Sequence, residues 1–131
     1  MKARRVVNRA QFQAVLAAGT VARTQHFALH RLALDARVAS AWRVAADWPE
    51  HAWMGVVTPK RWARRAVTRN AIRRQIDAVG AQPGALRAGC AHVVRLRAAF
   101  APAQYPSATS VALKRAVRAE LIALFERARQ S

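Results

Sequence analysis

The segment that most constrains this chain is residues 64–79, RRAVTRNAIRRQIDAV, which separates apolar from cationic side chains. At about 100° per residue, Ile72, Ile76 and Val79 fall on one stripe of an α-helix. Arginine side chains and Asn70 cover the adjoining and opposite surface. One side of this helix must therefore pack against another layer of the fold, and the other side must face solvent or an anionic partner.

Extended segments flank this helix in the sequence. Residues 52–58, AWMGVVT, precede it and end at Pro59, and residues 89–98, GCAHVVRLRA, follow it after a turn rich in Gly and Pro. Both segments contain paired valines and are bounded by turn residues, as strands are. A helix between two strands is a crossover within one sheet, which predicts an α+β class with a mixed central sheet.

Residues 25–35, QHFALHRLALD, predict another strand, with two different faces. Phe27 and Leu29 alternate with Ala28 and His30, so the two pairs point to opposite sides of a sheet. The expected order of elements is α-β-β-β-α-β-α, in one domain over residues 1–131, as the length suggests.

The connection at residues 36–51 is rich in Ala and holds Trp42 and Trp48. We interpret it as a loop that contains a short hairpin or a helical turn. Two Trp in a connection can pack against a sheet edge or stack on bases. We favour packing, because a Trp side chain buries a large apolar area.

Two further helices are predicted at the ends of the chain. Residues 8–19 begin with the capping residue Asn8, with Gln11 three positions on, and end at Gly19, which favours a left-handed stop. Residues 108–129 form the last helix, after a connection with Pro and Tyr. The apolar stripes consist of Phe12, Val15 and Leu16 in the first helix, and of Leu113, Val117, Leu121, Leu124 and Phe125 in the second.

Charge restricts the function more than the fold. The chain has 23 Lys and Arg against 6 Asp and Glu, a formal charge of +17, and 20 of the cations are Arg. A coding bias towards Ala and Arg is one explanation, since 32 residues are Ala. The other is functional, because guanidinium groups bind phosphate bidentately and stack on bases where ammonium groups cannot. Self-repulsion of this size is relieved by a polyanion, so we expect an anionic partner.

Side chains for catalysis or metal binding are few and scattered. The 6 acidic residues form no acid–base pair at local spacing. His26 and His30 are four apart on a strand, which separates them by more than about 12 Å, too far to share one metal ion. Asp77 lies four residues after Arg73 on one helix, so we expect an ion pair between them. We expect no catalytic residue and no metal bound by the protein.

The single Cys90 excludes an internal disulfide and suits a reducing compartment, where we expect it to be a small buried apolar residue. No segment reaches the roughly 18 apolar residues of a membrane span. The basic residues 1–9 lead into a segment without the apolar core of a signal peptide. We therefore expect a cytoplasmic protein.

Cations are concentrated between positions 60 and 74, where seven occur in fifteen residues. A solvent-exposed helix face usually carries both positive and negative side chains, but here Asp77 is the one acidic residue near these cations. A row of Arg along a helix neutralises successive phosphates, so this run indicates nucleic-acid binding, with the type of nucleic acid open. The candidate binding residues are Lys60, Arg61, Arg64, Arg65, Arg69, Asn70, Arg73 and Arg74.

The same region resembles the signature of the bacterial ribonuclease P protein family. In that family a strand ends in a small residue and two basic residues, and a turn leads through Ala-Val to an Arg-Asn-Arg helix. Here the pattern reads TPKR at 58–61, AVT at 66–68 and RNAIRR at 69–74. The segments FQAVLAAG at 12–19, HFALHRL at 26–32 and LIALFERAR at 121–129 also look like their counterparts, so the resemblance covers nearly the whole chain.

The resemblance implies a small fold with a left-handed crossover around the motif helix, although right-handed crossovers are the rule. It also implies the protein subunit of an endoribonuclease, which assists a catalytic RNA in removing the 5′ leader from precursor tRNA. The RNA performs the chemistry with Mg²⁺ in that family. The protein binds the RNA subunit and precursor tRNA with its leader, and no cofactor of its own or membrane is expected.

The resemblance also assigns roles to individual residues. The motif helix and the basic pair before it match positions that contact the RNA subunit. Phe12 matches an aromatic residue that lines a cleft for the single-stranded leader, although a plain core position is an equal alternative. Leu16, Ala28 and His30 complete the expected leader groove, because unstacked bases are held by flat side chains and nearby cations.

Two positions depart from the family pattern, since Ala71 replaces an Arg and Asp77 stands where a further cation is usual. A ribosomal-protein-like RNA-binding module is the alternative function, because it shares the charge, the size and the Arg-rich helix. A membrane-surface protein is a third class, since the last helix is amphipathic and basic, but packing on the sheet explains its apolar face better. A nuclease with its own active site is the least favoured.

Overall fold

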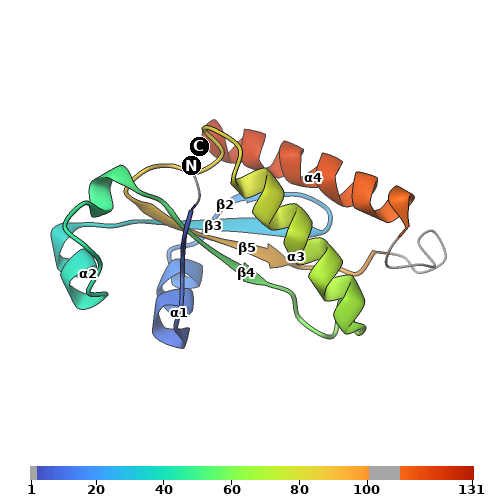
Figure 1. The fold of residues 1–131 in the computed structure, drawn as a ribbon, viewed down its shortest axis with the longest axis horizontal. Coiled ribbons are helices and arrows are strands. Elements are labelled where there is room, and N and C mark those ends of the chain that lie inside the picture. The colour runs from blue at the N-terminus through green and yellow to red at the C-terminus, as the bar shows by residue number, and fades with distance from the viewer. Residues whose placement is uncertain (1–2, 101–109) are drawn as a thin grey trace.

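The computed structural model describes residues 3–100 and 110–131 and shows one sheet with helices on both faces (Figure 1). The elements in chain order are β1 (Arg4–Arg5), α1 (Arg9–Ala17), β2 (Thr20–Arg23), β3 (Phe27–Ala33), α2 (Ala36–Ala41), the 3₁₀ turn η1 (Trp48–Glu50), β4 (Trp53–Val57), α3 (Ala66–Gly80), β5 (Cys90–Leu96) and α4 (Val111–Arg129). The predicted Pro- and Tyr-containing connection, and the first two positions predicted for the last helix, lie outside the described residues.

The sheet has five strands in the order β1-β4-β5-β3-β2 and is mixed. The β1–β4 and β4–β5 pairs are parallel, and the β5–β3 and β3–β2 pairs are antiparallel. Helices α1 and α2 lie on one face, and α3 and α4 lie on the other (Figure 1). These findings confirm the predicted α+β class with a mixed sheet. The strands β1 and β2 lie where no strand was placed from the sequence, and α2 is added to the predicted order.

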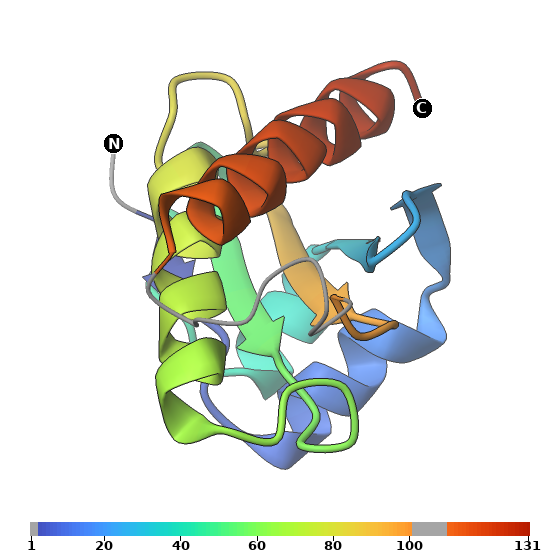
Figure 2. The ribbon, with the colours of Figure 1, turned by 90° about the vertical axis from the view of Figure 1, so that its right-hand side faces the viewer.

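The crossover from β4 through α3 to β5 is left-handed (Figures 1 and 2). A right-handed connection between these two strands would place the helix on the face that α1 covers. Instead α3 packs beside α4, and this arrangement leaves the α1 side of the sheet free of the cationic helix.

Local sequence signals explain the helix ends. Asn8 caps α1, because its Oδ1 accepts a hydrogen bond of 2.8 Å from the backbone N–H of Gln11. Gln11 Oε1 accepts in turn from the N–H of Val7 at 2.9 Å. Gly19 ends this segment with φ of +100°, a conformation that disfavours side chains. The predicted capping pair and left-handed stop are thus confirmed.

Residues 36–51 contain helical structure rather than a hairpin. Asp35 caps α2 by accepting a hydrogen bond of 2.8 Å from the N–H of Val38. Trp42 and Trp48 are half-buried against the smaller hydrophobic core. The predicted packing of the two Trp is therefore confirmed, and of the two predicted alternatives for this connection the helical turn is the one observed.

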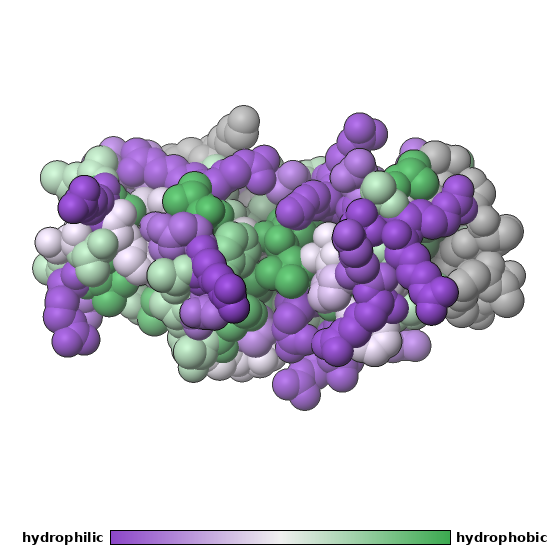
Figure 3. Space-filling view, turned by 90° about the horizontal axis from the view of Figure 1, so that it is seen from below, coloured by the Kyte–Doolittle hydropathy of each residue, from purple (hydrophilic) through white to green (hydrophobic). Residues whose placement is uncertain are grey.

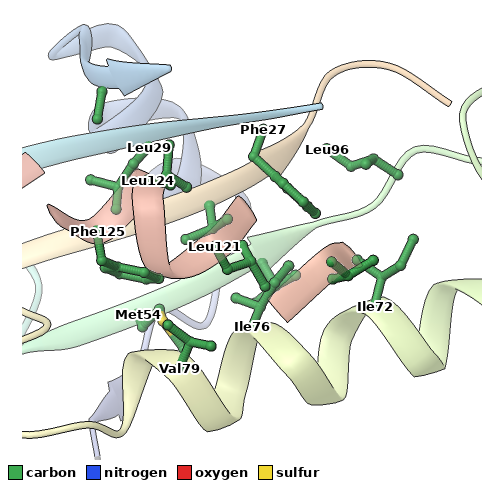
Figure 4. Packing of buried hydrophobic residues seen from close by; sticks show 14 of the residues in the cluster. Phe27, Leu29, Met54, Ile72, Ile76, Val79, Leu96, Leu121, Leu124 and Phe125 are labelled. Carbon is green, nitrogen blue, oxygen red and sulfur yellow. The ribbon is translucent and has the colours of Figure 1, made fainter. Parts of the chain in front are cut away.

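Two hydrophobic cores lie on opposite faces of the sheet. The larger core joins α3 and α4 to the sheet through side chains such as Phe27, Leu29, Ile76 and Leu121, all fully buried (Figure 4). The smaller core lies under α1 and includes Val15. Burying a Leu or Ile side chain stabilises a fold by roughly 1.5–3 kcal/mol, so α3 is anchored mainly by its apolar stripe.

The predicted ion pair between Asp77 and Arg73 is wrong. The structure pairs Asp77 with Arg5 of β1, at 3.9 Å between Oδ2 and Nη2. Arg73 instead donates from Nη1 to the backbone oxygen of Val56 at 3.4 Å. The reason is that α3 lies along the β1–β4 edge of the sheet, where tertiary partners compete with the neighbour on the same helix.

Candidate nucleic-acid interface

The predicted cationic residues lie on α3 and on the turn before it, residues 59–65, which we call the basic turn. Seven of the eight predicted residues have exposed side chains, and one is half-buried. The exposed residues are Lys60, Arg61, Arg64, Arg65, Asn70, Arg73 and Arg74, and the half-buried one is Arg69. The larger core holds the opposite side of α3, so the helix presents its cations outward.

Arg69 shapes the basic turn. Its Nη1 donates to the backbone oxygens of Ala63 and Arg64, at 3.0 and 2.8 Å. Arg65 occupies the N-cap position of α3 and provides no side-chain hydrogen bond to it. The Arg69 guanidinium therefore closes the turn in place of a cap, and its predicted contact with RNA stays a prediction.

Arg61 stacks on the ring of Trp62, with its Cζ 5.0 Å from the ring centroid. Trp62 packs against the larger core, so it is a fixed platform. A guanidinium over an aromatic face gains roughly 0.5–1 kcal/mol at an exposed site. The sequence pattern marked Arg61 but did not single out the Trp that orients it.

The four residues predicted for the leader groove belong to the α1 side of the sheet, which we call the α1 face. Ala28 is 0% exposed and His30 is 6% exposed, so neither side chain presents appreciable surface to a ligand. Phe12 and Leu16 of α1 are half-buried. Burial thus limits Ala28 and His30 to the floor of this face, and their contact with a leader stays a prediction.

Phe12 packs directly on the sheet backbone. Its ring lies over Gly55 of β4, where an added Cβ would stand 2.5 Å from Phe12 Cε1. No side chain larger than hydrogen fits there without moving the ring. Phe12 therefore packs against the smaller core while staying half-buried, and its role in a leader groove stays a prediction.

His30 connects the floor of the α1 face to a cation that sequence analysis missed. Its Nε2 accepts a hydrogen bond of 3.3 Å from Nε of Arg95 on β5. Burial lowers the pKa of His30, and the nearby charge of Arg95 lowers it further. His30 is thus kept neutral as an acceptor, and this bond orients the Arg95 guanidinium.

Arg95 belongs to a group of four guanidinium groups, the Arg95 cluster: Arg23, Arg61, Arg95 and Arg97. Burial lowers the pKa of Arg95, and the charges of Arg97, Arg23 and Arg61 add to this effect. Arg97 also donates to the backbone oxygens of Thr24 and Gln25, at 2.8 and 2.9 Å, and so fixes the β2–β3 turn. Val57, the last residue of β4, pairs with Arg95, and the basic turn begins two residues later, so the basic turn adjoins the α1 face.

Seen from the α1 side, apolar side chains gather in patches near the middle of the face, and hydrophilic side chains crowd one end of it (Figure 3). Apolar surface beside clustered guanidinium groups offers a stacking surface and phosphate ligands together, the combination that single-stranded nucleic acids require.

Several acidic side chains of the described residues have structural partners. Glu120 of α4 accepts from Thr24 Oγ1 at 2.6 Å and from the backbone and ring nitrogens of His26, both at 2.7 Å. Asp47 forms two hydrogen bonds of 3.0 Å with Arg4. Cys90 is buried, as predicted, and burial raises its thiol pKa.

Neither metal-site geometry nor a membrane helix is found in residues 3–100 and 110–131. No three His, Cys, Asp or Glu side chains of this part of the chain gather as metal ligands would. None of its helices combines the length and the hydrophobicity that crossing a membrane needs.

Comparison with known proteins agrees with this geometry. The family profile described as Ribonuclease P matches residues 1–128. The Ribonuclease P protein component of Ralstonia pickettii is 35% identical over 125 residues, which cover 95% of this chain and 79% of the relative. That of Bordetella parapertussis is 45% identical over 84 residues, 63% of each chain. The 2.0 angstrom structure of Staphylococcus aureus RNase P protein shares the fold, with a TM-score of 0.64 and 18% identity over 95% of this chain and 94% of that one. The chain therefore belongs to the ribonuclease P protein family, whose members act with a catalytic RNA to remove the 5′ leader from precursor tRNA.

Proposed function

We propose that the basic turn and α3 hold the catalytic RNA subunit, while the α1 face and the Arg95 cluster hold the 5′ leader of precursor tRNA. The observation that carries this division is the register of β4 and β5, which pairs Val57 with Arg95, so that the basic turn begins two residues after the partner of Arg95. The two surfaces adjoin there. A strand that leaves the RNA-bound end of the protein can therefore continue onto the α1 face.

On the RNA side, the proposed role of the protein is electrostatic. Lys60, Arg64, Arg65 and Arg74 are exposed on the basic turn and α3, and each can neutralise one phosphate and release a counterion. Backbone contacts of this kind give affinity and register rather than sequence selection. Ala71 shortens the row by one cation relative to the family pattern, and Asp77 is engaged with Arg5 rather than with a neighbouring cation of the row.

On the leader side, the proposed contacts combine stacking with charge. Phe12 and Leu16 provide the uncovered apolar surface, and Arg95 provides a guanidinium that His30 holds in one orientation. Ala28 and His30 support these groups from beneath. Selection for a single strand follows, because a base can reach a half-buried ring only when it is unstacked.

The proposed chemistry belongs to the RNA, which requires Mg²⁺ for hydrolysis of the phosphodiester bond. The protein lowers that requirement by supplying fixed cations around the complex of two polyanions. A role as a ribosomal-protein-like module is not favoured, because the family profile spans 1–128.

The test is precursor-tRNA cleavage at a Mg²⁺ concentration where a bacterial ribonuclease P RNA alone is nearly inactive. We expect the protein to restore cleavage at the mature 5′ end, and the protein without RNA to cleave nothing. Absence of stimulation at every Mg²⁺ concentration would contradict the proposed function.

A second experiment tests the division between the two surfaces. Arg95→Ala should raise the KM for precursor tRNA and leave the affinity for the RNA subunit unchanged. Arg37→Ala, on the exposed surface of α2, removes the same charge and serves as the matched control. Equal loss of affinity for the RNA subunit and for substrate would show that the α1 face has no separate role.

A further inference from the structure

A second basic surface lies at the far end of α3, where the loop at residues 81–89 meets α4. Two cavities of about 260 and 250 Å³ adjoin there and share Ala85 and Arg129 in their walls. Their walls contain four Arg and one acidic residue, Glu126. We call this the Arg129 surface, after its cations Arg31, Arg87, Arg118 and Arg129.

Two guanidinium groups of this surface converge on a single oxygen. Arg31 and Arg87 each donate from Nη2 to the backbone oxygen of Ser131, at 3.2 and 3.0 Å. Arg31 also donates to the backbone oxygen of Ala128 at 3.1 Å, near the end of α4. Each guanidinium donates one hydrogen bond to this oxygen, and its remaining N–H groups are of the kind that bind phosphate oxygens.

The backbone of Arg87 is held in place by the buried His92 of β5. Its backbone N–H donates to Nε2 of His92 at 3.2 Å, and the His92 ring contacts the backbone oxygen of Trp53 through Nδ1 at 3.1 Å. Because Nε2 accepts, Nδ1 is the donor and the buried ring is neutral. Arg87 thus projects from a loop that β4 and β5 hold in place.

The charges of this surface are poorly balanced. Arg31 and Arg87 repel each other, and Glu126, whose side chain is exposed, lies 3.9 Å from Arg129. An anion beside these groups would relieve the repulsion. An acidic ligand is therefore the partner that the charge favours.

Apolar surface lies next to these cations. Ile122 of α4 is 51% exposed, and the cavity it borders is walled by Val79, Pro83 and the buried Phe125. An apolar partner would cover this wall but would supply no anion to Arg118 and Arg129, which line the same cavity. A nucleotide matches both the cations and the apolar wall, because its phosphate can bind the guanidinium groups while its base or ribose covers the wall.

The Arg129 surface is separate from the basic turn. The two lie at opposite ends of α3, whose 15 residues span about 22 Å at 1.5 Å per residue. No single phosphate can contact both ends. We propose that the Arg129 surface binds a single-stranded RNA segment and so forms a further RNA contact, distinct from those of the basic turn and the α1 face.

This proposal depends on the proposed function in one respect, which is that the partner is RNA. The experiment measures the affinity of the ribonuclease P RNA and of its complex with precursor tRNA for Arg118→Ala, Arg129→Ala and Arg87→Ala, at several salt concentrations. Arg31 is left intact, because it holds the end of α4. Arg37→Ala is the matched control on the opposite side of the sheet.

We expect Arg118→Ala and Arg129→Ala each to weaken binding about five-fold near physiological salt and to lower the salt slope by roughly 0.7–0.9. Arg129→Lys should keep the slope. A photoreactive group attached at Arg129→Cys should cross-link to RNA, and one at Arg37→Cys should not. The second thiol, Cys90, is buried and is spared by the label.

Affinities and slopes equal to those of Arg37→Ala, or equal cross-linking at both positions, would overturn the proposal. Arg87→Ala also removes a contact with Ser131, so its thermal unfolding is recorded beside its affinity. If wild-type protein failed to stimulate cleavage, the proposed function would fall first. Normal stimulation with unchanged Arg118 and Arg129 variants would overturn the Arg129 surface alone.

Discussion

The basic turn with α3 and the α1 face are assembled in opposite ways. The first is one continuous run of residues, with its cations a few positions apart. The second is built from α1, β3 and β5, and its key hydrogen bond joins His30 to Arg95, 65 positions apart. A surface made from one segment is visible in the sequence, whereas a surface made from several becomes visible only with the strand register.

The two regions also differ in what a substitution changes. The cations of α3 are mostly exposed, so their removal should alter binding with little effect on folding. Phe12 and His30 are half-buried or buried, so their removal should alter both. The predictions below use this difference, beginning with the side chain that should affect stability alone.

Ile76→Ala should have the largest effect, because Ile76 is 0% exposed in the larger core and has no part in the cationic surface. Removing a buried Ile side chain costs roughly 2–5 kcal/mol. Urea unfolding should show this loss. The salt slope of RNA binding, measured where the variant is folded, should equal that of wild type. A changed slope would mean that packing of α3 and phosphate binding are not separable.

Much of the fold follows from local signals in the sequence. The stripe of Ile72, Ile76 and Val79 predicted the buried side of α3, and Asn8 with Gln11 predicted the start of α1. These interactions span three or four residues, so periodicity and capping detect them. The left-handed crossover was implied by family resemblance only, because no property of the segment itself opposes the usual hand.

The missed features depend on tertiary contacts. Arg95 sits in an apolar strand, and its direction becomes known only when His30 is seen to pair with Val93 and thus to lie beside Arg95 on one face. The ion pair between Asp77 and Arg5 was not predicted, because β1, which carries Arg5, is two residues long and gives no periodic signal. Ala28 and His30 were placed on the correct face, but alternation cannot say that α1 covers them.

Acid should destabilise the fold through His92, which links the loop at residues 81–89 to β4. Burial lowers the pKa of His92 to about 4 from 6.5. The unfolded chain therefore binds the extra proton more readily, so stability is complete above pH 6.5 and falls as the pH drops towards 4. The full loss is about 3 kcal/mol. Urea unfolding between pH 7 and 4.5 measures it, and an unchanged pH dependence in His92→Asn would contradict this assignment.

Phe12→Ala should affect both stability and leader binding, unlike any substitution on α3. Removing a half-buried aromatic side chain over Gly55 should cost about 1–3 kcal/mol and should also weaken binding of precursor tRNA relative to mature tRNA. Phe12→Leu separates the two effects, because it keeps apolar volume and removes the flat ring. If Phe12→Leu keeps its stability but no longer prefers precursor tRNA over mature tRNA, Phe12 lines the leader groove. If this preference is unchanged, Phe12 is a core residue only.

Arg74→Ala should give the smallest effect and the cleanest one. Its side chain is exposed, so its loss should leave the unfolding free energy nearly unchanged. Binding of the RNA subunit should weaken about five-fold, with a salt slope lower by roughly one ion.

Arg69→Ala is the partner measurement for Arg74→Ala, and it completes the comparison within α3. Arg69 closes the basic turn through Ala63 and Arg64, so its loss should lower RNA affinity by more than the loss of one phosphate contact. The excess should be independent of salt, because it reflects disorder of the turn rather than lost counterion release. Identical affinities and slopes for the two variants would show that the Arg69 hydrogen bonds do not organise the turn. In that case the whole run at residues 60–74 would act as a uniform row of charges.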